Sequence, residues 1–161
     1  MIRAIVACTN DGGIGNNGTM PWPKNKHDLK WFKDSTMGDV VVMGRKTWED
    51  PNFPKPLPGR YNIVVTSRKD IKRAGMAIPI EKLKSTIEIY NKQNDIWIIG
   101  GKQLYEASWP MLDEVWISWI SGQYECDTKL NIEDMVCGFQ PYEIFNDSRN
   151  DFRYAKWERI T

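Results

Sequence analysis

Two short stretches of the sequence combine glycine with basic residues and could bind phosphate groups. Gly44-Arg45-Lys46-Thr47 follows the apolar run Val40 to Met43, and Gly100-Gly101-Lys102-Gln103 follows the run Asp95 to Ile99. Where a strand leads into a helix, free backbone N–H groups attract anions, and glycine lets a bulky anion approach closely. Each stretch therefore predicts an anion-binding turn. For the first stretch alone, the alternative that its two cations are ordinary solvated charges stays open.

A third strand end extends this pattern. Thr66-Ser67-Arg68 follows the run Tyr61 to Val65, so three strands of one parallel sheet would end in groups that bind anions. Such a row suits a phosphorylated dinucleotide, and Arg45 with Arg68 would suit an additional ribose phosphate. The residues therefore favour NADPH over NADH as cofactor. A P-loop nucleotidase is disfavoured because the chain lacks the GxxxxGK[ST] pattern.

The stretch Gly13-Ile14-Gly15-Asn16-Asn17-Gly18 matches the dinucleotide pattern GxGxxG. That pattern requires a helix to begin within it. Here Met20-Pro21-Trp22-Pro23 follows, and two prolines so close together prevent a regular helix. We therefore reject a Rossmann interpretation and predict a flexible glycine-rich loop that could act as a lid, with a plain connector as the alternative.

Asp28 is the candidate catalytic group. In a helix expected over Lys26 to Thr36, Asp28, Phe32 and Ser35 share one face. An acid next to an aromatic side chain on that face is suited to a binding site. The alternative is that Asp28 only caps the first turn of the helix. Trp22 is the tryptophan expected close to Asp28, because the prolines beside it hold it near the helix.

Composition limits the other possible functions. The chain has 161 residues with 22 basic and 21 acidic ones, which fits one domain over residues 1–161 and suggests neither a nucleic acid nor a membrane as partner. Cys8, Cys126 and Cys137 are odd in number and fit a reducing cytoplasm. The single histidine, His27, lies among lysines and is expected at the surface, so no metal site is predicted.

The order of apolar runs predicts an α/β protein with mostly parallel strands. The expected strands are Ile2 to Cys8, Val40 to Met43, Tyr61 to Val65, Asp95 to Ile99 and Glu114 to Ile120. The expected helices are Lys26 to Thr36, Arg45 to Glu49, Glu81 to Lys92 and Lys102 to Ala107. Near the end, Tyr142 to Phe145 and Phe152 to Trp157 flank a polar turn and predict an antiparallel hairpin at the sheet edge.

The motifs together resemble those of the dihydrofolate reductase family over essentially the whole chain. They are Ile14-Gly15, Met20-Pro21-Trp22, Asp28-Leu29-Lys30-Trp31-Phe32, Met43-Gly44-Arg45-Lys46-Thr47-Trp48-Glu49, Pro56-Leu57-Pro58-Gly59-Arg60, Ile98-Ile99-Gly100-Gly101 with Tyr105, and Glu125-Cys126-Asp127-Thr128. The resemblance implies a central, mostly parallel eight-stranded sheet with about four helices. It also implies a monomer that reduces 7,8-dihydrofolate to tetrahydrofolate with NADPH.

The resemblance assigns roles on the substrate side. Asp28 would be the single buried acid, accepting hydrogen bonds from the pterin, while Ser118 would bond its carboxylate and Trp22 would hold an ordered water. Residues 12–24, with Met20, would form the lid, and Arg60 would pair with the substrate's α-carboxylate. The implied catalytic residues are Asp28, Trp22, Met20 and Ser118. The implied substrate-binding residues are Ile5, Ala7, Asp28, Leu29, Phe32, Leu57, Arg60, Ile99 and Ser118.

The resemblance also implies a cofactor-binding set. Hydride would pass from the nicotinamide to pterin C6 and a proton would reach N5, with the direct proton donor left open. The set is Ala7, Ile14, Gly15, Gly18, Thr19, Gly44, Arg45, Lys46, Thr47, Thr66, Ser67, Arg68, Ile99, Gly100, Gly101, Lys102, Gln103, Leu104, Tyr105 and Thr128.

The chain departs from the family pattern at a few positions. Ser118 stands where threonine is usual, Lys102 replaces a commonly small residue, and Asp50 to Phe53 lacks the usual apolar pattern. Two alternatives remain beside the family's reaction: a pyrimidine reductase of the riboflavin pathway, and a non-catalytic binding protein with the same fold. Asp28 with Pro56-Leu57-Pro58-Gly59-Arg60 argues against the first, because these features suit a pterin and a glutamate tail. The second predicts decay at the site, and the retained Trp22, Asp28, Arg45, Arg60 and paired glycines argue against it.

Overall fold

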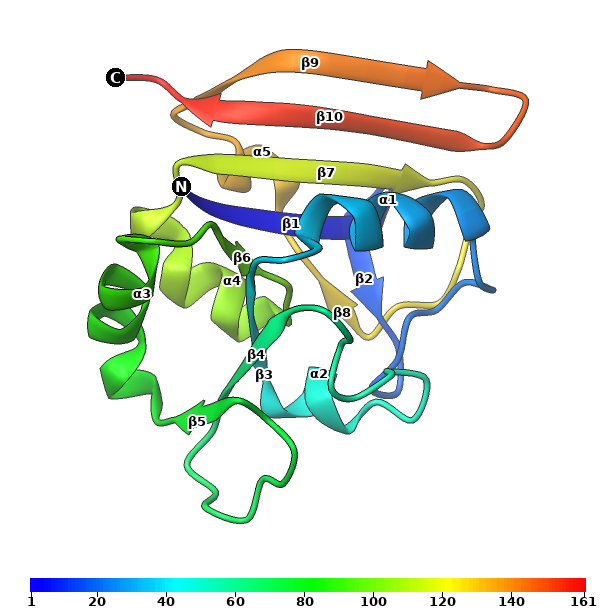
Figure 1. Cartoon of the computed structure of the whole chain (residues 1–161). Helices are drawn as coiled ribbons and strands as arrows, with labels where there is room; N and C mark the ends of the chain where they lie inside the picture. The colour runs from blue at the N-terminus through cyan, green and yellow to red at the C-terminus, as the bar shows by residue number, and fades with distance from the viewer.

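Eight strands form one sheet in the computed structural model, which describes residues 1–161. Their order across the sheet is β5-β4-β3-β6-β1-β7-β10-β9 (Figure 1). The bounds are β1 Ile2–Thr9, β3 Val40–Gly44, β4 Tyr61–Val65, β5 Met76–Ile78, β6 Ile96–Ile98, β7 Glu114–Ile120, β9 Phe139–Asp147 and β10 Phe152–Arg159. Neighbours from β5 to β7 pair in parallel, whereas β10 is antiparallel to both β7 and β9. The predicted sheet and its C-terminal hairpin are confirmed.

The central strands are buried on both faces, which explains their continuous apolar runs. Alternate residues of β3 enter two different hydrophobic clusters: Val40 and Val42 join one, while Val41 and Met43 join the other. The same alternation in β1 places Val6 in the first cluster and Ile5 in the second. Two cores therefore form, one on each face of the sheet, as the strand period of two residues requires.

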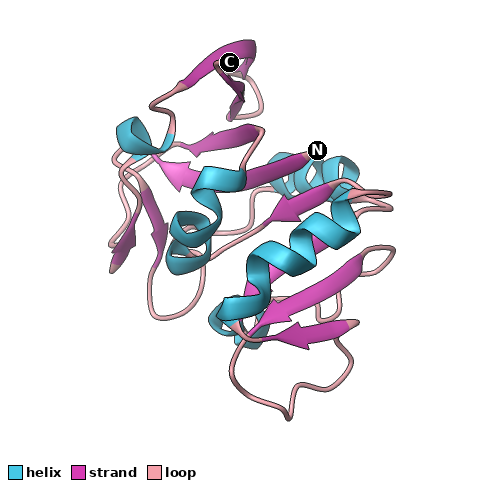
Figure 2. Ribbon diagram, turned by 90° about the vertical axis from the view of Figure 1, so that its left-hand side faces the viewer, coloured by secondary structure: helices cyan, strands magenta, loops and turns pink.

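Helices cover both faces of the sheet (Figures 1 and 2). Their bounds are α1 Lys26–Thr36, α2 Arg45–Glu49, α3 Leu83–Asn91, α4 Lys102–Ser108 and α5 Ile132–Met135, with the short 3₁₀ turns η1 Ile80–Lys82 and η2 Trp109–Met111. Residues of α3, α4 and α5 belong to the first cluster, whereas α1 and α2 pack against the second. None of these helices is long and apolar enough to span a membrane.

The structure adds elements to those predicted from the sequence. There are five α-helices rather than about four, because the four residues of α5 are too few to show a helical period. The predicted glycine-rich loop contains the short strand β2 (Gly13–Gly15), which pairs with β8 (Thr128–Lys129). Gly13 is required in this ribbon because a Cβ atom there would lie 2.3 Å from Cys126 Sγ.

Candidate active site

The two glycine turns meet at one edge of the sheet. Because β3 and β6 are parallel neighbours, both turns leave the sheet at the same edge, and Gly44 N donates a hydrogen bond to Gly100 O at 2.8 Å. Gly100 has a φ of +120°, and a Cβ atom there would lie 3.4 Å from the hydroxyl of Tyr105. The starts of α2 and α4, at Gly44 and Gly101, carry no side-chain cap. The first N–H groups of both helices are thus left without side-chain caps along one edge, as the predicted anion-binding turns require.

Tyr105 links the turn at Gly100 to the strand at the centre of the site. Its hydroxyl donates a hydrogen bond to Ile5 O on β1 at 2.7 Å, and burial raises the pKa of the phenol. Tyr105 and Leu104 are both buried in the first hydrophobic cluster. Their side chains therefore anchor α4 in the core, and the hydroxyl of Tyr105 also lies beside the turn at Gly100. Lys102 and Gln103, in contrast, are exposed.

The third strand end, Thr66-Ser67-Arg68, differs from the other two because its cation already has an acidic partner. Thr66 Oγ1 accepts a hydrogen bond from Arg68 N at 3.1 Å, which closes a local turn after β4. The guanidinium of Arg68 lies 3.6 Å from the carboxylate of Glu49, at the far end of α2. Arg45, at the start of α2, is half-buried and forms no ion pair. The two arginines expected to act together are therefore in different electrostatic surroundings.

Asp28 is buried in the first turn of α1 and does not cap that helix. The cap is Asn25, whose side chain accepts hydrogen bonds from the backbone N–H groups of His27 and Asp28, each at 3.1 Å. The carboxylate of Asp28 accepts a hydrogen bond from Ser118 Oγ on β7. The interpretation of Asp28 as a helix cap is thus wrong, because Asn25 already satisfies those donors.

Two opposing effects act on the pKa of Asp28. Burial raises it, and this effect is the larger, while the hydrogen bond from Ser118 lowers it. Asp28 therefore holds a proton at a higher pH than an exposed aspartate does. The Asp28 carboxylate also affects Cys8 on β1. Burial and the nearby carboxylates of Asp11 and Asp28 raise the pKa of the Cys8 thiol to about 12. Cys8 is a neutral core residue.

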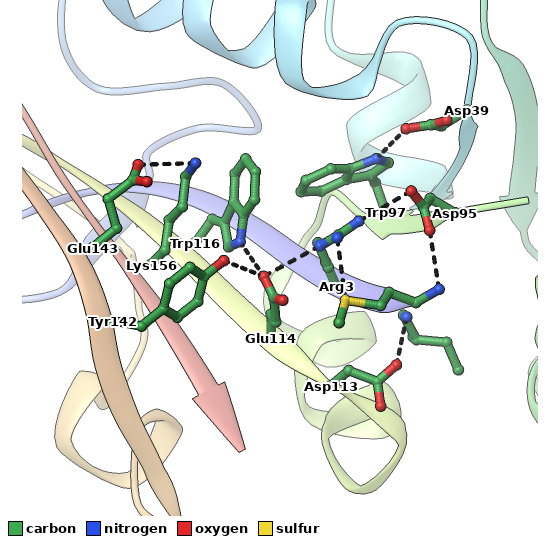
Figure 3. A network of polar contacts seen from close by, with 12 residues as sticks. Arg3, Asp39, Asp95, Trp97, Asp113, Glu114, Trp116, Tyr142, Glu143 and Lys156 are labelled. Atoms are coloured by element: carbon green, nitrogen blue, oxygen red, sulfur yellow. Dashed lines mark hydrogen bonds and ion pairs between the residues drawn. The ribbon is translucent and has the colours of Figure 1, made fainter. Parts of the chain in front are cut away.

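Asp28 is one of two buried acids, not the single one expected. Glu114, at the opposite end of β7, is equally buried, and one of its carboxylate oxygens has three hydrogen-bond donors (Figure 3). Its Oε1 atom accepts hydrogen bonds from Arg3 Nε at 3.3 Å, Trp116 Nε1 at 2.7 Å and Tyr142 Oη at 2.5 Å. Only Ser118 donates to Asp28. The remaining hydrogen-bonding capacity of Asp28 is available to a ligand.

Arg60 lies beside α1, at the other end from Asp28. Its Nε donates to Pro58 O at 2.9 Å and its Nη1 to Thr36 Oγ1 at 3.1 Å, while the guanidinium lies 6.0 Å from the centre of the Phe32 ring. Partial burial lowers the pKa of Arg60, yet an arginine remains a cation. The protein leaves Nη2 without a partner, so a carboxylate could still pair with this side chain.

The loop before Arg60 is held by a buried residue that the sequence analysis missed. Asn62 on β4 accepts a hydrogen bond from Leu57 N at 2.9 Å and donates to Leu57 O at 3.0 Å and Arg60 O at 2.9 Å. A polar residue inside the apolar run of β4 was the available signal. Leu57 and Ile5 are buried in the second hydrophobic cluster, against which Ile99 and Phe32 pack. These apolar side chains pack together on the face of the sheet that α1 covers.

The expected lid is held at two points. Asn17 N donates a hydrogen bond to Asp127 Oδ2 at 2.9 Å, and Asp127 N donates to Gly15 O at 3.0 Å. On the other side, Asn52 Nδ2 donates to Thr19 Oγ1 at 3.1 Å. The N–H of Asn17 is the main reason that the pKa of Asp127 lies below its ordinary value. The loop therefore reaches from β8 to the loop after α2.

The other predicted lid residues differ in exposure. Trp22 is buried and packs edge to face on Tyr124, with ring centres 6.5 Å apart, whereas Met20 is 39% exposed. Trp22 also lines a hollow of about 400 Å³ that reaches neither Asp28 nor Ser118. Leu29, predicted to bind substrate, is 37% exposed on α1. His27 is exposed, as expected, and its ring lies against Phe152.

Comparison with known proteins places the chain in a family. The family model described as dihydrofolate reductase matches residues 1–156. The chain belongs to the dihydrofolate reductase family. The dihydrofolate reductase of Mycobacterium leprae is 38% identical over 135 residues, covering 83% of this chain and 77% of the relative. That of Bacillus subtilis is 36% identical over 127 residues, covering 79% and 73%.

A solved structure supports the same assignment. Dihydrofolate reductase from Enterococcus faecalis, complexed with NADP(H) and RAB-propyl, superposes with a TM-score of 0.82 at 26% identity, covering 100% of this chain and 97% of that one. The activity of the chain is therefore that of a dihydrofolate reductase, EC 1.5.1.3, an NADP-dependent oxidoreductase of the folate pathway. This assignment excludes the pyrimidine reductase and the non-catalytic binding protein.

Replacing Ser118 by alanine should raise the pKa of Asp28 further. The substitution removes the hydrogen bond that favours the charged carboxylate and leaves the effect of burial in place. The pKa can be followed by NMR of the carboxyl carbon in the free protein. Ser121→Ala, which removes a hydroxyl bonded to Asp151, is the matched control. An unchanged or lower Asp28 pKa in Ser118→Ala would contradict this account.

Replacing Asp127 by asparagine should loosen the lid. The carboxylate that accepts from Asn17 N loses its charge, so the Asn17 amide should exchange its hydrogen faster. Because folding lowers the pKa of Asp127, the wild-type contact should hold above the ordinary aspartate pKa and weaken as the pH falls through the lowered value. Asp147→Asn, at the end of β9, should leave Asn17 exchange unchanged. Equal protection in both variants would refute the assignment.

Proposed function

We propose that the surface formed by the glycine turns of β3 and β6 binds NADPH. The support is the pair of uncapped helix starts, the close approach allowed at Gly44 and Gly100, and the cations at Arg45 and Lys46. A substituent on Gly100 would project against Tyr105, so bare backbone is what the cofactor phosphates would meet. The proposed contacts are the cofactor-binding residues named from the sequence.

Arg45 is the proposed main contact of the ribose phosphate that distinguishes NADPH from NADH. Arg45 has no acidic partner, so its charge is available to an anion. Arg68 already lies 3.6 Å from Glu49, and a phosphate would compete with that carboxylate. The two residues should therefore contribute unequally, although both lie at the same edge of the sheet.

Asp28 is the proposed anchor of the pterin. A buried carboxylate is costly unless it is paired, and Ser118 supplies only one donor. The amino group and ring nitrogen of a pterin offer two further donors side by side, which fit a carboxylate. The buried, half-satisfied carboxylate is the observation that carries this proposal.

The cofactor and the protein have different roles in the proposed reaction. When bound, NADPH supplies the hydride that reduces pterin C6. Asp28 would orient and polarise the pterin through hydrogen bonds to its carboxylate, and N5 would receive its proton through water. Trp22 and the lid of residues 12–24 would exclude bulk water. Arg60 would hold the carboxylate tail of the substrate. The apolar side chains of Ile5, Leu57 and Ile99 would contact the part of the substrate between the pterin and that tail.

Asp28→Asn should lower kcat/KM for dihydrofolate by about 10- to 100-fold or more, because a charged hydrogen bond contributes about 1.5–3 kcal/mol. Its affinity for NADPH should be unchanged. Steady-state oxidation of NADPH and fluorescence titration of the cofactor measure the two effects. Asp34→Asn removes an exposed carboxylate on the same helix that pairs with Lys30, and it should leave both values near wild type. Equal rates in the two variants would defeat the assignment.

Arg45→Gln should reduce the preference for NADPH over NADH more than Arg68→Gln does. Loss of a charged contact with a phosphate raises KM for NADPH by about 10-fold or more and leaves KM for NADH nearly unchanged. The ratio of kcat/KM for the two cofactors gives the measurement. A larger effect from Arg68→Gln would show that the ion pair with Glu49 opens on binding and that the order is reversed.

The single-domain, monomeric and cytoplasmic expectations stay predictions.

A further inference from the structure

Helix α1 touches the sheet at a second point besides Asp28. Trp31 lies three residues after Asp28 and therefore on nearly the same face of the helix. Its ring stacks on Trp116 of β7, with centres 5.9 Å apart and planes at 25°, and on Tyr154 of β10, at 4.7 Å and 19°. Trp116 and Ser118 are two residues apart and share one face of β7. One helix face thus meets one strand face through Asp28–Ser118 and through Trp31–Trp116.

The indole of Trp116 is held from several directions (Figure 3). Its Nε1 donates a hydrogen bond to Glu114 Oε1 at 2.7 Å. Lys156 Nζ lies 4.0 Å from the centre of its ring, and the guanidinium of Arg3 lies 5.5 Å from it. Both cations have acidic partners, since Arg3 pairs with Glu114 and Lys156 with Glu143. Cation–aromatic contacts of partly buried groups are stabilising, so Trp116 offers α1 a fixed surface.

Helix α1 has few other means of attachment. Of its eleven residues, only Asp28 and Thr36 are buried. Phe32 is half-buried beside Arg60, and Leu29 is largely exposed. The stack on Trp31 is therefore the largest aromatic contact that fixes the position of the helix turn carrying Asp28.

We propose that Trp31 is a positioning residue for the reaction: by stacking on Trp116 and Tyr154 it holds the Asp28 carboxylate at Ser118. The inference rests on the proposed role of Asp28 in binding the pterin. Glu114, Lys156 and Arg3 then support the site indirectly, because they hold the indole of Trp116 on which Trp31 stacks. Trp31 acts through Asp28 and does not need to touch the substrate.

The test compares variants of Trp31 with a variant of a second aromatic stack, Tyr90 on Tyr61. Trp31→Ala should raise Kd and KM for dihydrofolate by about 10-fold, as expected for the loss of the aromatic contacts with Trp116, Tyr154 and Phe152, with the Kd for NADPH within about 2-fold of wild type. Trp31→Phe, which keeps a stacked ring, should recover most of the loss. Tyr90→Ala is the matched control, because Tyr90 of α3 stacks on Tyr61 of β4 with centres 5.4 Å apart and planes at 23°. It should lower the melting temperature without raising KM for dihydrofolate.

Coupling to Asp28 separates positioning from direct contact. In an Asp28→Asn background, Trp31→Ala should weaken dihydrofolate binding by less than about 2-fold, because the group that it positions is already gone. An equal loss in both backgrounds would mean that Trp31 contacts the substrate itself, and it would overturn the inference. So would a Trp31→Phe variant as weak as Trp31→Ala, or equal losses for NADPH and dihydrofolate.

A second variant is needed if Trp31→Ala does not fold, and the Asp28→Asn result shows which of the two proposals has failed. If Trp31→Ala does not fold, Trp116→Phe serves instead: it keeps a ring under Trp31 but loses the bond to Glu114, and it should raise KM for dihydrofolate by about 3-fold in the wild-type background only. No change there would overturn the inference. If Asp28→Asn itself binds dihydrofolate normally, the proposed function fails; if only the Trp31 and Trp116 variants bind normally, the positioning role fails alone.

Discussion

Parallel pairing of β3, β6, β1 and β7 is the constraint on which the site depends. In parallel strands the carboxyl ends lie at one edge of the sheet, so every turn that follows them meets its neighbours there. The hydrogen bond from Gly44 N to Gly100 O joins two turns that are more than fifty residues apart in the chain. The same alignment sets Ser118 of β7 beside Ala7 of β1. The surfaces proposed for cofactor and substrate therefore share one edge.

Two buried acids contact opposite ends of β7, Glu114 as a residue of the strand and Asp28 through the hydroxyl of Ser118. Glu114 accepts hydrogen bonds from three donors of the protein, all at Oε1, and is a structural group. The carboxylate at the other end of the strand belongs to α1 and receives only the hydroxyl of Ser118. Burial without full pairing costs free energy, and folding tolerates such groups mainly where a ligand completes them. The end of β7 at Glu114 therefore stabilises the fold, whereas the end at Ser118 holds a carboxylate with hydrogen-bonding capacity left for a ligand.

The main elements could be predicted because their signals are long. The bounds of α1, α2, β4 and β7 coincide with the expected ranges, since each contains a clear apolar period or a glycine boundary. The elements that were missed, β5, β8 and α5, have between two and four residues. Segments so short are defined by their partners and not by their own sequence. β2 was likewise hidden in a glycine-rich loop, because its pairing with β8 depends on contacts across the chain.

For the site, the sequence alone determined the chemistry that is present: two glycine turns with cations, an acid on an amphipathic helix, and an arginine after a proline-rich loop. These are local properties of residue type and spacing. Only the tertiary structure decided that Asn25 and not Asp28 caps α1, that Glu49 lies against Arg68, and that a second buried acid exists. Burial, and the partners that burial demands, depend on segments brought together by the sheet, and no local pattern records which segments those will be.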